Sequence, residues 1–291
     1  MKNRIEYILL IAFSYLFRFM GLKISRKFGL IFALMFYYLI PIRKKTVLDN
    51  LRKTFPDLSE KEIKRLAFAN YKSFAVTFIE IFYSPFLSKE EMKNLVKCDK
   101  EILEVVKQKY ALGKGLIVLS GHIGNWEWTA ASIALQLGLP FSVIIKPQRN
   151  PFVTKWLDKM RTKWGNSVVP LGVSVRQTYQ VLLQKKVVAM VADQRGPIES
   201  PRIIFLGRSS AAYTGPAILA LKTGAPIFYG ISVRQPDMSY KAYIKEITTE
   251  NLPDDENEKV VELTKRHNEF LETFIRKYPE QWFWMHKRWK Y

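Results

Sequence analysis

The sequence predicts an α/β fold in which helices flank a mixed central sheet, preceded by an N-terminal helical membrane anchor. From Gly115 onward, short apolar runs of strand length alternate with stretches of helical periodicity, and this alternation predicts the sheet. The chain has 291 residues, 48% of them hydrophobic, so it is long and apolar enough to bury a core. Two aromatic-rich apolar runs before residue 43 predict the anchor.

The first apolar run extends from Tyr7 to Phe17 and the second from Phe28 to Ile42, with cationic residues between and after them. Neither run reaches the roughly 20 apolar residues that a transmembrane helix needs. We therefore expect helices that lie in the membrane surface or dip into it, with their cations at the lipid headgroups. Two buried core helices are the alternative. The expected division is an anchor over residues 1–45 and the main domain over residues 46–291.

Residues 1–110 have a mostly helical pattern, and the sequences SEKE (59–62) and SKEE (88–91) predict capping boxes that open two helices. Asn150 followed by Pro151 predicts another helix start, because Asn caps a helix and Pro suits its first position. Strands are expected at 116–120, 141–145, 168–171, 187–192, 203–206, 226–233 and 240–247. Helices are expected at 126–137, 151–164, 175–185, 215–223 and 256–277. The chain ends in PEQWFWMHKRWKY, a mixture of cations and large aromatics typical of a membrane interface.

The net charge of +20 indicates an anionic partner, such as nucleic acid, an anionic membrane surface, or an acidic substrate or carrier protein. The cations are spread through the chain without a motif that reads DNA or RNA, so nucleic acid is not the expected partner. The single cysteine, Cys98, excludes an internal disulfide and a cysteine-based zinc site.

The stretch LIVLSGHIGNWEW places His122 just beyond the expected strand at 116–120. Catalytic groups of α/β proteins gather at the carboxyl ends of strands. Glu127 follows five residues later, and a loop through Gly124 and Asn125 allows its carboxylate to meet the imidazole. Such a contact would fix the tautomer of His122 as a general base. The spacing alone is weak evidence, because a loop histidine followed by a capping glutamate gives the same pattern.

Other catalytic arrangements have no matching motif. No serine lies in a G-x-S-x-G elbow, and P-loop and dinucleotide fingerprints are absent. The three histidines, His122, His267 and His286, are too far apart in sequence for zinc-ligand spacing, so we expect no metal and no cofactor. These exclusions favour direct transfer, in which His122 deprotonates a substrate hydroxyl. We expect His267 to be solvated and His286 to be structural or interfacial.

The chain resembles the bacterial lipid A late acyltransferases, the lauroyl/myristoyl acyltransferase family, within the glycerolipid acyltransferases that share an H-x-x-x-x-(D/E) motif. The resemblance extends over nearly the whole chain. The segments that carry it are RKKTVLDNLRKTFPDLSEKE, GHIGNWEW, KPQRNP with the later Arg161 and Gly165, DQRGPIESPRIIFLGRSSAAYTGPAILALKTGAPI, and YPEQWFWMHKRWK. Arg195 departs from the acidic or neutral residue that many members have after the Asp-Gln pair.

The resemblance implies transfer of a fatty acyl group from acyl carrier protein to a hydroxyl of a membrane-embedded lipid A precursor. It places this step of lipopolysaccharide biosynthesis on the cytoplasmic side of the bacterial inner membrane. His122 would be the base and Glu127 its orienting partner. The thioester supplies the driving force, so neither nucleotide nor metal is required.

The resemblance also suggests five residues that contact substrate or hold those that do. Asn125 or backbone amides would stabilise the oxyanion, and Arg161 would meet phosphate or the carrier. Asp193 would hold Arg161 or another cation, and Lys146 and Arg208 are phosphate candidates. The ordinary alternatives are an exposed helix arginine for Arg161, a strand-end cap for Asp193 and a solvated loop lysine for Lys146.

Three other functions stay open. The first is the same chemistry on another acceptor, a lysophospholipid, an aminolipid or a glycolipid, since the same histidine serves any hydroxyl. A membrane-bound binding protein with this fold but without turnover is the second. A nucleic-acid binder driven by charge alone is the third, and the absence of a reading motif argues against it.

Overall fold

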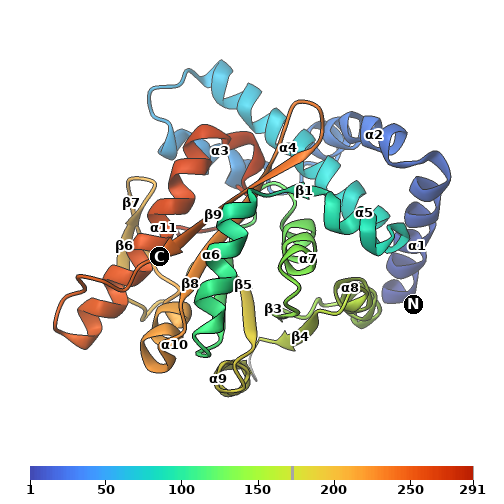
Figure 1. The fold of residues 1–291 in the computed structure, drawn as a ribbon. Coiled ribbons are helices and arrows are strands. Elements are labelled where there is room, and N and C mark those ends of the chain that lie inside the picture. The colour runs from blue at the N-terminus through green and yellow to red at the C-terminus, as the bar shows by residue number, and fades with distance from the viewer. Residues whose placement is uncertain (172–173, 291) are drawn as a thin grey trace.

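The computed structural model describes residues 1–171 and 174–290, and its centre is a seven-stranded mixed sheet (Figure 1). The strand order is β1-β9-β8-β2-β5-β3-β4, in which β8 and β9 pair antiparallel and the other neighbours are parallel. Its strands are β1 (Val96–Lys97), β2 (Leu116–Ser120), β3 (Phe141–Ile145), β4 (Ser167–Pro170), β5 (Val187–Val191), β8 (Ile227–Arg234) and β9 (Tyr240–Ile247). The predicted mixed sheet is confirmed, although β1 was not predicted.

The predicted strand at 203–206 lies outside this sheet. It is β6 (Arg202–Phe205), which pairs antiparallel with the unpredicted β7 (Arg208–Ala211) in a separate hairpin. The two turn residues, Leu206 and Gly207, have φ values of 51° and 77°. Positive φ at both positions is typical of a tight hairpin turn, and it favours the glycine found there.

The predicted helices are confirmed within two residues at each end. Both capping boxes form, at Ser59 with Glu62 and at Ser88 with Glu91, and Asn150 caps the helix that begins at Pro151. The α-helices are α1 (Lys2–Met20), α2 (Leu22–Leu34), α3 (Lys44–Thr54), α4 (Glu60–Tyr83), α5 (Lys89–Asn94), α6 (Lys100–Ala111), α7 (Trp126–Leu137), α8 (Pro151–Thr162), α9 (Ser174–Leu183), α10 (Gly215–Thr223) and α11 (Glu256–Lys277). A π-helix η1 (Met35–Leu39) and the 3-10 turns η2 (Ser84–Phe86) and η3 (Pro279–Gln281) complete the helical elements of the described residues.

The sheet is covered on both faces, so its strands are apolar almost throughout. Side chains of β2 alternate between two buried clusters, with Ile117 in one and Leu116 in the other. The first cluster packs against α3, α4, α9, α10 and α11, and the second against α5, α6 and α7. His267 belongs to α11 and is only 1% exposed, so the expectation that it is solvated was wrong. It shares the buried face of α11 with Leu263 and Leu271, which lie one turn before and after it.

The N-terminal helices α1 and α2 pack against α4, at the right of Figure 1. Phe17 and Tyr37 are buried there, yet most of the exposed large hydrophobic residues in the described chain fall within the first 42 residues, including Phe19 and Leu39. Among the described helices, none is long and apolar enough to cross a membrane alone. The pair 22–39 and Lys44–Thr54, bent by 95°, meets the requirement by length and composition.

Candidate active site

The site is built on two neighbouring parallel strands that end side by side. In the register of β2 and β5, Ser120 pairs with Val191. His122 and Asp193 each lie two residues beyond this pair, so both emerge at the same edge of the sheet. Gly124 then turns the loop with a φ of 60°, where a Cβ would lie 2.1 Å from the carbonyl oxygen of Ser232. Only glycine tolerates that approach.

Asp193 holds His122 through both the side chain and the backbone. Its Oδ1 lies 2.7 Å from Nδ1 of the imidazole, and its Oδ2 accepts from the His122 backbone N–H at 2.8 Å. The indole Nε1 of Trp282 also donates to Oδ2, at 2.9 Å. Burial opposes ionisation of Asp193, but the His122 charge and these hydrogen bonds lower its pKa to about 2. Asp193 is therefore a carboxylate at neutral pH.

The same contact determines which nitrogen of His122 can act. The Asp193 carboxylate accepts a hydrogen bond from Nδ1–H, so the ring proton stays on Nδ1 and Nε2 is the basic nitrogen. Burial lowers the pKa of His122, but the Asp193 charge and hydrogen bond, with a contribution from Glu127, raise it above its ordinary value overall. The rings of Trp126 and Phe283 flank the imidazole, with centroids 5.0 and 5.9 Å away. The ring is thus fixed in orientation and more basic than a free histidine.

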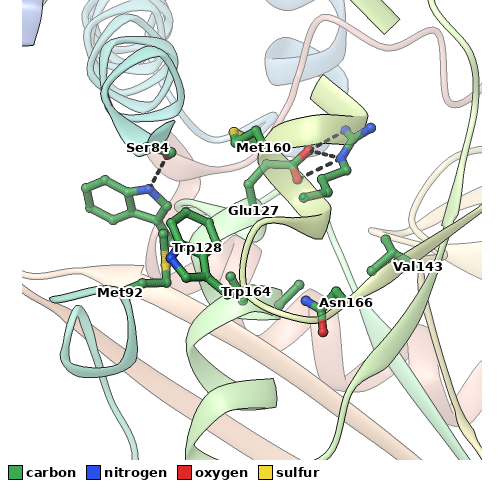
Figure 2. A pocket seen from close by; sticks show the side chains of 11 residues that line it. Ser84, Met92, Glu127, Trp128, Val143, Met160, Trp164 and Asn166 are labelled. Carbon is green, nitrogen blue, oxygen red and sulfur yellow. Dashed lines mark hydrogen bonds and ion pairs between the residues drawn. The ribbon is translucent and has the colours of Figure 1, made fainter. Parts of the chain in front are cut away.

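Glu127 does not make the contact that the sequence predicted. Its carboxylate binds the guanidinium of Arg161, with Nε to Oε2 at 2.9 Å and Nη2 to Oε1 at 2.5 Å. Figure 2 shows Glu127 beside Met160, with dashed lines marking this ion pair. The expected orienting role at Nδ1 belongs to Asp193, because Glu127 lies in the first turn of α7 and faces α8. Asp193 was expected to hold Arg161 or another cation; Arg161 binds Glu127 instead, and Asp193 contacts His122.

Arg161 is mostly buried, so the alternative of an exposed helix arginine is also excluded. Burial lowers its pKa, but the charge of Glu127 raises it overall. A bidentate pair of this kind holds both side chains in one geometry. It leaves a fixed guanidinium and carboxylate beside the imidazole.

A cavity of about 670 Å³ lies beside His122, between the sheet and the helices α6 and α7. Polar groups line the end at the carboxyl edge of the sheet, among them His122, Trp126, Glu127, Lys146, Gln148, Arg161, Gln194 and Arg195. Apolar side chains line the remainder, including Val106, Val118, Ile133, Leu137, Phe141, Val143, Phe228 and Ile244. Since Leu137 ends α7 and Phe141 begins β3, the cavity extends along α7 toward the amino edge of the sheet. Its shape suits a ligand with a polar head and a long apolar chain.

The three remaining residues predicted to contact substrate, Asn125, Lys146 and Arg208, differ from one another in their surroundings. Asn125 is fully buried: its Oδ1 caps α7 at Trp128 N, and its Nδ2 donates to Glu80 at 3.1 Å. The prediction that it contacts substrate was wrong, because both ends of its amide are used within the protein. Lys146 is exposed after β3 and lines the cavity. Arg208 lies on the β6–β7 hairpin, over the ring of Trp289 at 4.2 Å, and is not among the cavity-lining residues.

The aromatic ending of the chain has a role that sequence reasoning missed. Trp282 and Trp284 are at most 1% exposed, so the prediction of a membrane interface was wrong for them. Residues 282–283 contact the loop that carries His122. Ile123 and Trp282 form an isolated bridge, and Phe283 N donates to the His122 carbonyl oxygen at 3.0 Å. The closing Tyr291 lies outside the described residues. The signal in the sequence was the density of Trp itself, since a buried indole N–H requires an acceptor.

No group of three or more His, Cys, Asp or Glu residues is placed to hold a metal ion within the part of the chain that the structure describes. The donors around His122 are suited to acid–base chemistry on an organic substrate.

A family model described as bacterial lipid A biosynthesis acyltransferase matches residues 2–291. The chain is 23% identical over 253 residues to the lipid A biosynthesis palmitoleoyltransferase of Escherichia coli (strain K12). It is 24% identical over 250 residues to the lipid A biosynthesis lauroyltransferase of the same strain. Both alignments cover 85% of this chain and 79% of the relative. A shorter match, 24% identical over 120 residues, relates 40% of the chain to 39% of the phosphatidylinositol mannoside acyltransferase of Mycolicibacterium smegmatis.

Proposed function

Because the chain belongs to the bacterial lipid A biosynthesis acyltransferase family, we propose that it transfers a fatty acyl group from acyl carrier protein to a hydroxyl of a lipid A precursor. The observation that carries this proposal is the cavity, whose polar end holds His122 and whose apolar remainder follows α7. A fatty acyl thioester matches both parts. The chain would lie among the apolar side chains, with its carbonyl carbon near the imidazole.

The proposed reaction needs no covalent enzyme intermediate. Nε2 of His122 removes the proton of the acceptor hydroxyl as its oxygen attacks the thioester carbonyl carbon. The tetrahedral intermediate then collapses, the carbon–sulfur bond breaks, and the proton passes from His122 to the leaving thiolate. Asp193 stabilises the imidazolium that forms between these steps.

The Glu127–Arg161 pair would orient the acceptor. Both side chains line the cavity next to His122, and they are mostly buried. Arg161 has further N–H donors besides those that bind Glu127, and its Nη1 lies 3.8 Å from Asp158 Oδ1. Such donors would suit a phosphate or sugar of the acceptor. Exposed Lys146 lies at the same end of the cavity and would add a second cation.

We also propose that residues 1–45 contact the cytoplasmic side of the bacterial inner membrane, while residues 46–291 form the acyltransferase domain. The exposed hydrophobic residues concentrated near the N-terminus support this division. The net charge of +20 would attract both anionic lipids and an acidic carrier protein.

A different lipid acceptor is the second candidate. The match to a phosphatidylinositol mannoside acyltransferase favours it, because that relative is named for a glycolipid other than lipid A. The His122–Asp193 arrangement would serve either hydroxyl equally, so the acceptor must be determined by experiment.

The full chain, purified and given acyl carrier protein loaded with a fatty acid, should add one acyl mass to a lipid A precursor in mass spectrometry. A parallel reaction would contain a phosphatidylinositol mannoside, with lysophospholipid as a third acceptor. Product on the mannoside or lysophospholipid alone would replace the lipid A proposal with the second candidate. The absence of product with every acceptor would contradict acyl transfer itself.

Replacing Gly230 with Val should shift the donor preference toward shorter acyl chains. Gly230 lines the cavity from β8, and a Cβ there would meet Ile244 Cγ1 at 3.6 Å, an ordinary contact distance. A Cβ therefore fits without a clash, and we expect the valine methyl groups to occupy cavity space. The measurement is kcat/KM for carrier thioesters of increasing chain length, with Gly230→Ala as the graded control. An unchanged chain-length profile in both variants would show that the acyl chain lies elsewhere.

A further inference from the structure

We propose that Arg26, on the N-terminal helix α2, is a positioning residue that acts through buried Glu80 on the loop carrying His122. The N-terminal helices would then be part of what shapes the active site, in addition to contacting the membrane. This inference rests on the proposed function, and the experiment below separates the two.

Glu80 of α4 is fully buried and is approached from four elements. Its Oε1 accepts from Arg26 Nε at 2.8 Å and lies 2.7 Å from Arg26 Nη2. Its Oε2 accepts from the Tyr240 hydroxyl at 2.5 Å and from Arg234 Nη2 at 3.3 Å. The fourth donor to Glu80 is Asn125 Nδ2, at 3.1 Å. A carboxylate buried among so many donors fixes the elements that supply them.

Asn125 connects this network to the catalytic helix. While its Nδ2 donates to Glu80, its Oδ1 accepts from Trp128 N in the first turn of α7. That turn also carries Glu127, and the loop immediately before it carries His122. A shift of Glu80 would therefore be transmitted to both sides of the site.

Arg26 reaches α7 by a second route. Its guanidinium carbon lies 5.7 Å from the centroid of the Trp128 ring, within the range of a cation–π contact. The Trp128 indole is also held by a hydrogen bond from Nε1 to Ser84 Oγ at 2.7 Å (Figure 2). Arg26 thus contacts the start of α7 directly through Trp128 and indirectly through Glu80.

The same network contacts the loop between His122 and Asn125. Thr77 Oγ1 donates to the Gly124 carbonyl oxygen at 3.0 Å, and Arg234 Nη2 donates to Thr77 Oγ1 at 2.6 Å. Gln281 connects the C-terminal segment to this network. Its backbone carbonyl oxygen accepts from Gly124 N, and its side chain forms hydrogen bonds with the backbone of Arg234. Among these contacts, Arg26 is the one that comes from the N-terminal helices.

Charge explains why Arg26 matters to the position of Glu80. Glu80 faces two arginines, of which Arg234 is 7% exposed and Arg26 15% exposed at the side chain. Without Arg26, Oε1 would lose the hydrogen bond from Nε and the ion-pair contact with Nη2. A buried acceptor left unpaired seeks another partner. We expect the Glu80 carboxylate to rotate, which would weaken its bond to Asn125 and loosen the cap of α7.

The test compares Arg26→Gln with Lys27→Gln. The two residues are adjacent on α2 and each variant loses one positive charge, but Lys27 is exposed and outside the network. Arg26→Gln should lower kcat for acyl transfer by about 10- to 100-fold with KM for the carrier thioester little changed, the effect of a small displacement of catalytic groups. Lys27→Gln should retain kcat. Binding to phosphatidylglycerol vesicles should fall by the same small factor in both.

Arg26→Lys tests the same contact with the positive charge retained, so it should recover part of kcat. The recovery should be incomplete because an ammonium group lacks the planar fork of donors of a guanidinium. If Arg26→Gln does not fold, Arg26→Lys carries the test, with reduced kcat expected. Equal kcat for the arginine variants and Lys27→Gln would overturn the proposal.

Amide hydrogen exchange gives a readout that does not depend on turnover. Arg26→Gln should accelerate exchange in residues 121–129, and Lys27→Gln should not. If the wild-type chain transfers no acyl group, the proposed function fails while this exchange result still judges the positioning role. Unchanged exchange in Arg26→Gln would overturn the role even in an active enzyme.

Discussion

Replacing His122 with Gln should reduce acyl transfer by at least about 100-fold, the scale of a positioned general base. Glutamine is close in size to histidine and can still donate to Asp193, so the loop should retain its shape. Its amide has no basic nitrogen in place of Nε2, and the acceptor hydroxyl would keep its proton. The measurement is kcat with saturating carrier thioester and acceptor, followed by mass spectrometry of the product.

His267→Gln is the matched control for this experiment. His267 is a second buried histidine, but it lies on α11 and does not line the cavity. Burial lowers its pKa to about 3, so it is neutral at the pH of the assay. Transfer by the folded fraction should be retained in this variant. Normal transfer by His122→Gln would contradict the assignment of the base.

Replacing Asp193 with Asn should cost about 10²- to 10⁴-fold in kcat, because the orienting carboxylate selects the tautomer of its histidine. In the protein, Nδ1 of His122 lies 2.7 Å from Oδ1 of Asp193 and must carry the proton. An asparagine amide group can instead donate to Nδ1, which would leave the proton on Nε2 and remove the base. Asp49→Asn on the exposed face of α3 is the control and should retain full activity.

The residual activity of Asp193→Asn should also change its pH dependence. A general base works in its unprotonated form, so activity rises as the pH passes upward through the pKa of His122. Burial lowers this pKa, and in the wild type the Asp193 charge, the Asp193 hydrogen bond and the Glu127 charge together outweigh that effect. Loss of the charge should therefore lower the pKa and move the acid limb of the kcat–pH profile to lower pH. An acid limb at the wild-type position would contradict the pairing of His122 with Asp193.

Stability should respond to pH through the same carboxylate. The pKa of Asp193 is about 2 in the folded protein, below the ordinary value of 3.8. Its contribution to the free energy of unfolding is thus present above about pH 4 and is lost as the pH falls toward 2. Asp193→Asn lacks this contribution and should show a shallower loss of thermal stability over that pH range.

The fold class followed from the sequence because its determinants are local. Strand-length apolar runs and helical periodicity are properties of short windows, and so are caps such as Ser59 with Glu62. The placement of 203–206 in a separate hairpin was not predictable in this way, since strand pairing joins distant residues. The burial of His267 was in principle readable from its spacing to Leu263 and Leu271, although the charged residues around it suggested solvent.

The sequence by itself determined that His122 stands just past a central strand, with Glu127 in the first turn of α7 and a loop between them. Tertiary structure decided which acid meets the imidazole. Asp193 is 71 residues away from His122 along the chain. It reaches His122 because β5 pairs in parallel with β2, and each residue lies two positions beyond the paired residues Ser120 and Val191. Tertiary structure also decided that Glu127 binds Arg161 and that Trp282, in the Trp-rich ending, donates to Asp193. Spacing along a chain constrains only neighbours within an element, whereas the register between strands brings together residues that no local pattern relates.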